Sequence, residues 1–181
     1  MKIMKLILSC AALCFAAGCG AQENPEFNVT IDDTVKELDL NRYLGKWYEI
    51  ARFDHSFERG LVGATANYSL REDGKIKVLN TGYKDSFEGK FNEAEAKAYI
   101  PDENYPGALK VSFFLFFYSD YWVLDLDENY TFALIGSKKA KYLWILSRTP
   151  EMAPADLDRV LNRATSLGYD TSELIWVEHR D

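Results

Sequence analysis

Alternation between polar and apolar side chains limits the fold of this chain more than any other feature of its sequence. It is clearest between residues 90 and 99, where Glu93, Glu95 and Lys97 alternate with three alanines. A period of two places successive side chains on opposite faces of a strand. Turn residues interrupt the pattern about every eight to twelve residues, which is typical of an all-β sandwich or barrel. The predicted strands cover residues 47–53, 64–70, 75–81, 90–99, 109–113, 120–126, 131–137 and 142–148.

After residue 148 the period changes to that of a helix. Pro154 favours a helix start and Gly168 favours its end, and residues 174–177 then return to a strand. The apolar stripe of this helix consists of Leu157, Val160, Leu161 and Ala164. Eight antiparallel strands joined up-and-down close into a barrel just wide enough for one small ligand. The fold class predicted here is therefore all-β: an eight-stranded up-and-down antiparallel barrel with one C-terminal helix.

Two segments about a hundred residues apart carry a more specific signal. Gly45 and Trp47 open the first predicted strand, and Arg148 closes the eighth strand four residues after Trp144. Because side chains alternate, Trp144 and Arg148 share a face. This pattern resembles the signature of the lipocalin family, in particular its bacterial outer-membrane and apolipoprotein D-like members, over roughly residues 38–177.

The lipocalin resemblance implies several further features. Arg148 should pack across Trp47 through a cation–π contact, at the closed floor of a ligand-binding calyx. Gly45 belongs to the same barrel-floor signature. Asp127 should be the acid of the second family motif. The C-terminal helix should pack on the outside of the barrel, with the last short strand beside the sheet.

The first residues predict a lipoprotein leader. A basic start and a short apolar run identify residues 1–18 as a signal peptide that is too short to span a bilayer. Cys19 follows the small-residue cleavage site and resembles a bacterial lipidation site; an ordinary signal-peptide cysteine is the alternative. We expect residues 19–34 to be a lipid anchor and tether, and residues 35–181 to be the lipocalin domain. Gly20 carries no acidic retention signal, which by analogy favours a lipid-anchored place in the cell outer membrane.

The charge balance excludes one class of partner. The chain has 21 basic and 28 acidic residues, for a formal net charge of −7. Removal of Lys2 and Lys5 with the leader leaves 19 basic residues against 28 acidic ones. Such an acidic domain is not expected to bind nucleic acid.

Candidate ligand contacts follow from the strand faces. The resemblance to apolipoprotein D implies that Tyr68 and Trp144 line the pocket, and steps of two from such anchors place Glu49, Ala51, Ala66, Leu70 and Leu146 inward. The remaining strands supply an apolar inward face: Ile76, Val78, Ala96, Ala98, Leu109, Val111, Phe113, Tyr121, Val123, Ala133 and Ile135. Small alanines opposite large residues favour a cavity over a filled core, although any single position could be plain core. The predicted ligand-binding residues are Tyr68, Val111, Phe113, Tyr121, Trp144 and Leu146.

One inward position is left open. A carboxylate at Glu49 needs a partner if it faces an apolar interior. It could bind a ligand hydroxyl or a buried water, or the strand could bulge and turn it outward.

The expected mouth of the barrel carries two features. Its loops collect a basic rim: His55, Arg59, Lys84, Lys138, Lys139 and Lys141. This rim indicates an anionic ligand head, unless these are merely solvated loop residues. Residues 114–118 form an apolar run that could be a lid, a membrane-dipping tip or a dimer contact.

These observations favour binding over catalysis. We expect the chain to bind a long-chain fatty acid such as palmitate, or a lysophospholipid, for lipid storage or transport at the bacterial cell envelope. No enzyme activity, cofactor or metal is expected, because the mature domain has no cysteine beyond Cys19 and its two histidines lack metal-ligand spacing. The alternative is an envelope interaction protein, or a homodimer, that uses the aromatic mouth loop 114–118.

Overall fold

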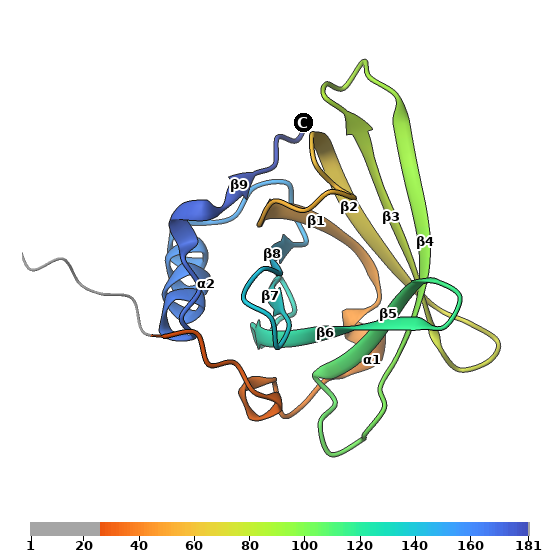
Figure 1. The fold of residues 1–181 in the computed structure, drawn as a ribbon, viewed down its shortest axis with the longest axis vertical. Coiled ribbons are helices and arrows are strands. Elements are labelled where there is room, and N and C mark those ends of the chain that lie inside the picture. Colours follow the sequence, from red (N-terminus) through yellow and green to blue (C-terminus); the bar gives the residue numbers. More distant parts are fainter. Residues whose placement is uncertain (1–25, 181) are drawn as a thin grey trace, which may run out of the picture.

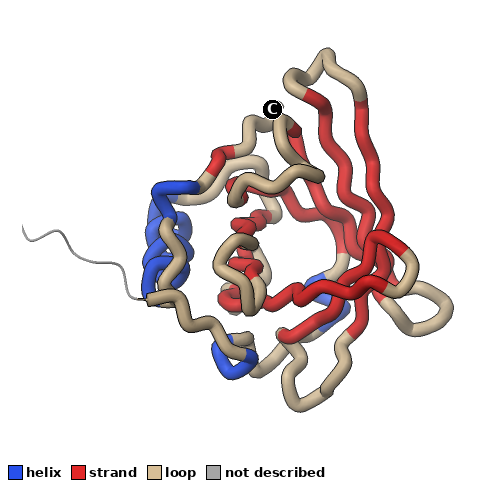
Figure 2. Tube along the Cα trace, in the orientation of Figure 1, coloured by secondary structure: helices blue, strands red, loops and turns tan. Residues whose placement is uncertain are grey.

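Eight antiparallel strands close into a barrel in the computed structural model, which describes residues 26–180 (Figures 1 and 2). The ring closes because β1 pairs with both β2 and β8. The strands are β1 (Gly45–Arg52), β2 (Leu61–Leu70), β3 (Ile76–Lys84), β4 (Phe91–Tyr99), β5 (Ala108–Phe114), β6 (Phe117–Leu126), β7 (Phe132–Gly136) and β8 (Leu143–Ser147). A short ninth strand, β9 (Ile175–Trp176), pairs with β1 on the outside of the ring. The predicted fold class is confirmed. The predicted signal peptide, residues 1–18, and Cys19 lie outside the described residues.

Helix α2 (Pro154–Ser166) packs against the outer face of the barrel, as predicted, and Figure 1 shows it beside the ring of strands. Its residues Val160 and Ala164 are fully buried in a cluster with Leu134 of β7 and Ile145 of β8. A second, separate cluster lies inside the barrel, around Trp47. The alternating strands therefore serve two apolar cores, one facing the helix and one facing the cavity.

The segment before the barrel is more closely packed than a tether. The ring of Phe27 lies 5.0 Å from that of Tyr169, and Val29 and Thr34 are buried. A 3₁₀ turn, η1 (Ile31–Asp33), lies between them. The predicted tether over residues 19–34 is thus wrong for residues 26–34, which belong to the folded domain.

Strand β1 contains a bulge that changes which residues face inward. Glu49 pairs with Leu146 and Ala51 pairs with Ile145, so Ile50 is an additional residue in the ladder. Ala51 consequently joins the outer cluster, and the prediction that it faces the cavity is wrong. A bulge places two residues opposite one and so reverses the alternation beyond it.

The floor of the barrel is held by Arg148 and Trp47. The guanidinium of Arg148 lies 3.8 Å from the centre of the Trp47 ring, as the lipocalin resemblance implied. Arg148 also donates hydrogen bonds to the carbonyls of Lys46 (2.8 Å) and Arg42 (2.6 Å). Trp47 donates from its indole Nε1 to the carbonyl of Tyr43, at the end of the short helix α1 (Leu40–Tyr43). One arginine therefore ties β8 to β1 and to the helix that covers the floor.

Two further signature residues have clear structural reasons. Gly45 adopts a φ of +95°, where a side chain would be strained, and a Cβ there would also touch the Arg148 guanidinium. Asp127 accepts hydrogen bonds from the backbone N–H groups of Asn129, Thr131 and Phe132 and so shapes the β6–β7 turn. Burial alone would raise the pKa of this carboxyl, but these three donors lower it below its usual value.

Candidate ligand-binding site

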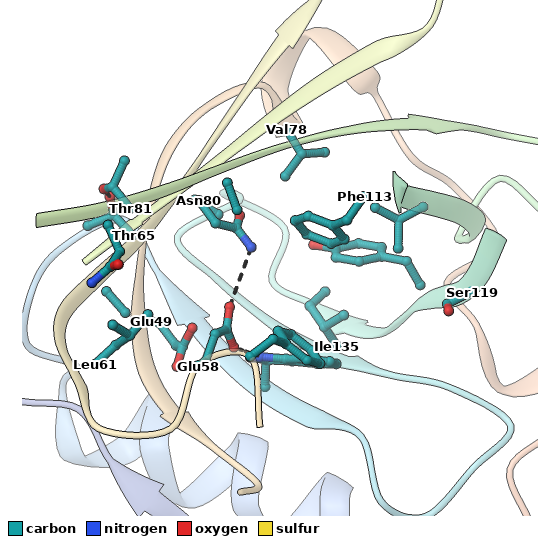
Figure 3. A pocket seen from close by; sticks show the side chains of 18 of the residues that line it. Glu49, Glu58, Leu61, Thr65, Val78, Asn80, Thr81, Phe113, Ser119 and Ile135 are labelled. Atoms are coloured by element: carbon teal, nitrogen blue, oxygen red, sulfur yellow. Dashed lines mark hydrogen bonds between the residues drawn. The ribbon is translucent and has the colours of Figure 1, made fainter. Parts of the chain in front are cut away.

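A cavity of about 670 Å³ opens at the end of the barrel opposite the Trp47 floor. This volume lies in the usual range for small-molecule sites. All six predicted contact residues lie on its wall: Tyr68, Val111, Phe113, Tyr121, Trp144 and Leu146. Figure 3 shows Val78, Phe113 and Ile135 reaching into the same space. One inward prediction is wrong, because Leu70 is the last residue of β2 and is 58% exposed at the end of the barrel.

Small side chains on the inner wall leave room for a ligand. Ala64 and Ala66 of β2 and Ala94 of β4 line the cavity opposite larger residues. Ala96 and Ala98 continue the same face of β4 into the interior cluster. A wall of this composition presents apolar surface that is removed from water when an apolar chain enters.

Three tyrosines form a hydroxyl chain near the floor. The Tyr121 hydroxyl lies 2.6 Å from that of Tyr43 and 2.7 Å from that of Tyr68. Burial raises the pKa of all three well above the ordinary value for tyrosine, so each keeps its proton. Three hydroxyl groups have three protons and two bonds between them, so one proton is available to a further acceptor.

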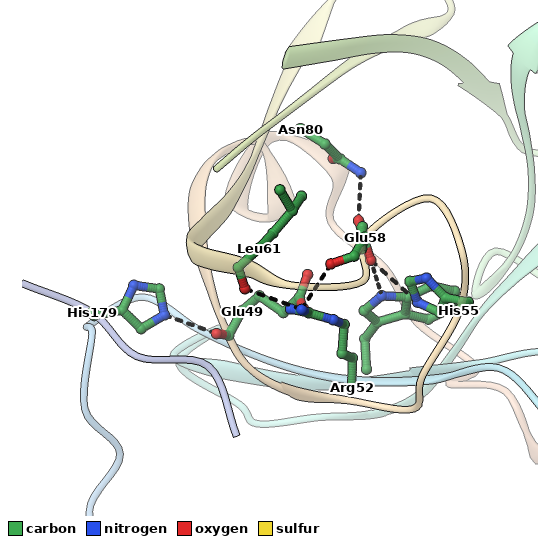
Figure 4. A network of polar contacts seen from close by, with 8 residues as sticks. Glu49, Arg52, His55, Glu58, Leu61, Asn80 and His179 are labelled. Atoms are coloured by element: carbon green, nitrogen blue, oxygen red, sulfur yellow. Dashed lines mark hydrogen bonds and ion pairs between the residues drawn. The ribbon is translucent and has the colours of Figure 1, made fainter. Parts of the chain in front are cut away.

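A buried contact with Arg52 answers the open question at Glu49. Its carboxylate faces the cavity and lies 2.6 Å from the guanidinium of Arg52, which the β1 bulge turns to the same side (Figure 4). Arg52 also donates to the carbonyls of Glu58 (2.9 Å) and Leu61 (3.1 Å). Burial, and then the nearby carboxylate of Glu58, raise the pKa of Glu49 to about 8. The strand thus bulges, as one alternative required, but Glu49 still faces inward.

Glu58 is a second carboxylate on the cavity wall, and sequence reasoning missed it. The β1–β2 loop folds back over the mouth and leaves Glu58 only 7% exposed. Its carboxylate accepts a hydrogen bond from the indole Nε1 of Trp144 (3.0 Å) and a longer one from the amide of Asn80 (3.4 Å). Figures 3 and 4 show Asn80 and Glu58 facing each other.

His55 is not part of a rim, contrary to prediction. It is buried between Phe57, whose ring stacks on it at 4.0 Å, and Trp144. Its Nε2 atom lies 3.2 Å from the Glu58 carboxylate. Burial and the nearby Arg52 lower the pKa of His55 to about 4, so the imidazole is neutral at pH 7.

The predicted basic rim is largely neutralised by carboxylates. Arg59 pairs with Asp54 at 2.7 Å, Lys84 with Asp85 at 3.2 Å, and Lys138 approaches Asp120 at 3.8 Å. Lys139 and Lys141 are exposed and form no ion pair among the described residues. The mouth therefore does not present the concentrated positive charge that was expected to attract an anionic head.

The apolar run at residues 114–118 forms a tight hairpin instead of a loop. Strand β5 ends at Phe114 and β6 begins at Phe117, because Leu115 takes a left-handed conformation with a φ of +48°. The tip is highly exposed, and Phe116 reaches 85%. Phe113, Phe114 and Phe117 also line the mouth, so the cavity wall continues into the exposed tip.

Two other kinds of feature do not occur in residues 26–180. No three His, Cys, Asp or Glu side chains gather closely enough there to hold a metal ion. No helix of this part of the chain has the length and apolar character needed to cross a bilayer.

Comparison with known proteins gives the family. A family profile described as a lipocalin-like domain matches residues 38–179. The chain belongs to the lipocalin family. It is 49% identical over 147 residues to outer membrane lipoprotein Blc of Vibrio cholerae, covering 81% of this chain and 85% of that protein. It is 44% identical over 178 residues to outer membrane lipoprotein Blc of Escherichia coli K12, covering 98% of each. Apolipoprotein D of Macaca fascicularis is 36% identical and is aligned over 96% of this chain and 94% of its own.

Solved lipocalin structures agree with the fold. Insecticyanin of the tobacco hornworm Manduca sexta matches with a TM-score of 0.67 and 23% identity, over 87% of this chain and 88% of its own. Apocrustacyanin C2 matches with a TM-score of 0.68 and 16% identity, over 87% and 91%. At these identities, the two structures support the lipocalin barrel alone.

Proposed function

We propose that this lipocalin binds one long-chain fatty acid or lysophospholipid in its barrel, for lipid storage or transport at the bacterial cell envelope. The cavity carries the proposal: it is closed at the Trp47 floor, open at the other end and lined mainly by apolar side chains. Each methylene of an acyl chain that leaves water contributes about 0.8 kcal/mol.

The proposed place is the outer membrane, with Cys19 carrying the lipid anchor. Bacterial relatives named outer membrane lipoproteins, aligned over 98% of both chains in one case, support this location and agree with the prediction from the leader. An anchored domain would bind lipids released beside the same membrane. We propose no catalysis, since lipocalins are generally binding and transport proteins.

Native mass spectrometry tests the binding function. The sample is the mature chain with Cys19→Ser, which lacks the anchor, denatured to remove bound lipid and then refolded. Titration with palmitate or lysophospholipid should give one-to-one adducts. Ala66→Trp should abolish them, because it fills the cavity. The control Lys77→Trp adds the same ring to the outer side of β3, where Lys77 pairs with Glu95, and should leave the adducts intact. A folded protein without adducts for either lipid would contradict the proposal.

The exposed hairpin tip supports a second candidate function. Leu115, Phe116 and Phe117 form an apolar surface that a monomeric soluble protein rarely shows. We propose that this tip contacts another envelope protein or a second copy of the chain. Sedimentation of the Cys19→Ser chain against a Leu115→Ser/Phe116→Ser variant tests self-association. A monomer at every concentration in both proteins would exclude the homodimer.

A further inference from the structure

Glu58 is a buried carboxylate that makes no direct contact with a lysine or arginine side chain among the described residues, although the Arg52 guanidinium donates to its backbone carbonyl. Among the described residues its one close charge partner is His55, which is neutral at pH 7 because burial and Arg52 lower its pKa. Trp144 and Asn80 donate hydrogen bonds to it but bring no charge. A buried carboxylate without a counter-charge is costly, so a cation at this position would stabilise it.

The neighbouring groups on this side of the cavity also accept hydrogen bonds. The Oδ1 atom of Asn80 is buried and has no hydrogen-bond donor among the described residues. Glu49 lies on the same wall and binds the guanidinium of Arg52, which donates to the backbone carbonyl of Glu58 and not to its carboxylate. Burial and the nearby Glu58 raise the pKa of Glu49 to about 8, so at pH 7 Glu49 is mostly neutral and Glu58 is the carboxylate on this wall that lacks a contacting cation. A carboxylate also has about four acceptor positions, and Glu58 uses two of them in hydrogen bonds.

Other cations at the mouth do not supply the missing charge. Arg59 and Lys84 line the cavity, but each is exposed to solvent and pairs with its own aspartate. Aromatic rings complete the surroundings: Phe57, Tyr142 and Trp144 lie on the same part of the wall, and the last two rings stack at 5.9 Å. Aromatic faces attract cations, including organic ammonium groups.

We propose that the wall around Glu58, Asn80 and Trp144 is a subsite for the ammonium group of a single-chain amphiphile. The inference rests on the proposed lipid-binding function and narrows it. The acyl chain occupies the apolar cavity, and a positively charged nitrogen lies against the Glu58 carboxylate. A lipid whose head group carries an ammonium fits this wall, whereas a fatty-acid carboxylate would face the buried Glu58 carboxylate.

Three amphiphiles with the same chain and different heads test the subsite: dodecylamine, dodecanol and dodecanoate. Each is titrated at pH 7, below its micelle concentration, into the refolded mature chain with Cys19→Ser. We expect dodecylamine to bind at least about tenfold more tightly than dodecanoate, in keeping with the free energy of a charge-assisted hydrogen bond. Glu58→Gln keeps the side-chain shape and removes the charge, so it should abolish this preference while binding dodecanol as before.

Glu93→Gln is the matched control. Glu93 lines the same cavity, but it is exposed, so solvent screens its charge. This variant should keep the preference within about twofold of the parent chain, and melting curves establish that both variants are folded.

The outcomes separate this inference from the function on which it rests. If dodecanoate binds as well as dodecylamine, or if Glu58→Gln keeps the preference, the ammonium subsite is wrong while lipid binding stands. If none of the three amphiphiles binds, the lipid-binding function fails, and the subsite fails with it.

Discussion

The hydroxyls of Tyr43, Tyr68 and Tyr121 show how single polar atoms can decide the stability of an otherwise apolar interior. Tyr121 bridges the other two, so its hydroxyl is the only partner that either of them has among the described residues. A buried polar group that loses its partner costs about 1–3 kcal/mol.

Tyr121→Phe should therefore lower the free energy of unfolding by about 1–3 kcal/mol, as measured by urea denaturation. Tyr142→Phe is the control, because the Tyr142 hydroxyl forms no hydrogen bond with the described residues. It should change stability by less than about 0.5 kcal/mol. Equal effects of the two substitutions would mean that the hydroxyl chain contributes nothing.

His55 makes stability depend on pH. Its pKa is about 4 in the folded protein against 6.5 for an ordinary histidine, so the unfolded chain binds more protons between these values. The contribution of neutral His55 to the free energy of unfolding is fully present above pH 6.5 and is lost as the pH falls toward 4. The glutamine side chain of a His55→Gln variant does not bind a proton in this pH range. Its melting temperature should therefore fall less than that of the parent chain between about pH 7 and about pH 5. Parallel pH profiles would contradict the buried, neutral state of His55.

At the scale of elements, Arg148 joins β8, β1 and α1 at the floor. It lies over the Trp47 ring and donates to carbonyls of Arg42, Tyr43, Lys46 and Tyr130. The planar guanidinium makes these contacts together, whereas a lysine ammonium reaches fewer of them.

Arg148→Lys should therefore destabilise the domain by about 2–3 kcal/mol even though the charge is kept. Guanidinium denaturation followed by tryptophan fluorescence measures the change. Lys46→Arg, an exposed substitution at the same end of the barrel, should change stability by less than about 0.5 kcal/mol. An Arg148→Lys variant as stable as the parent chain would show that charge alone holds the floor.

The elements also show what the sequence could and could not predict. Period-two alternation located all eight barrel strands, because each strand separates a wet or helix-facing side from the cavity side. Alternation failed at Ala51, because a bulge depends on ladder pairing that one strand alone does not encode. Glu58 was missed, and His55 was wrongly placed on an exposed rim, for a related reason. A polar loop is expected to be exposed, and its return over the mouth depends on tertiary contacts to Trp144 and Arg52.

At the scale of the whole molecule, ligand and fold should stabilise each other. A lipid that binds only the folded barrel, at a free concentration of about 100 times its Kd, adds about 2.7 kcal/mol. For a domain of this size that corresponds to a rise in melting temperature of about 5–11 °C. Scanning calorimetry with and without lysophospholipid measures it, and Ala66→Trp should show no rise. A rise of the same size in that variant would place the lipid outside the barrel.

The additional residue at Ile50 has a practical consequence for anyone who wishes to change the ligand preference of this barrel. A redesign that follows strict alternation along β1 would substitute Ala51, and the new side chain would collide with the packing under α2 instead of reshaping the pocket. The position that faces the cavity side is Arg52. The bulge also absorbs one residue of strand length. A chain from which Ile50 is deleted would keep Glu49 and Arg52 on the inner side and Phe53 on the outer side. One residue can therefore be present or absent at this point without exchanging the inner and outer faces of the strand.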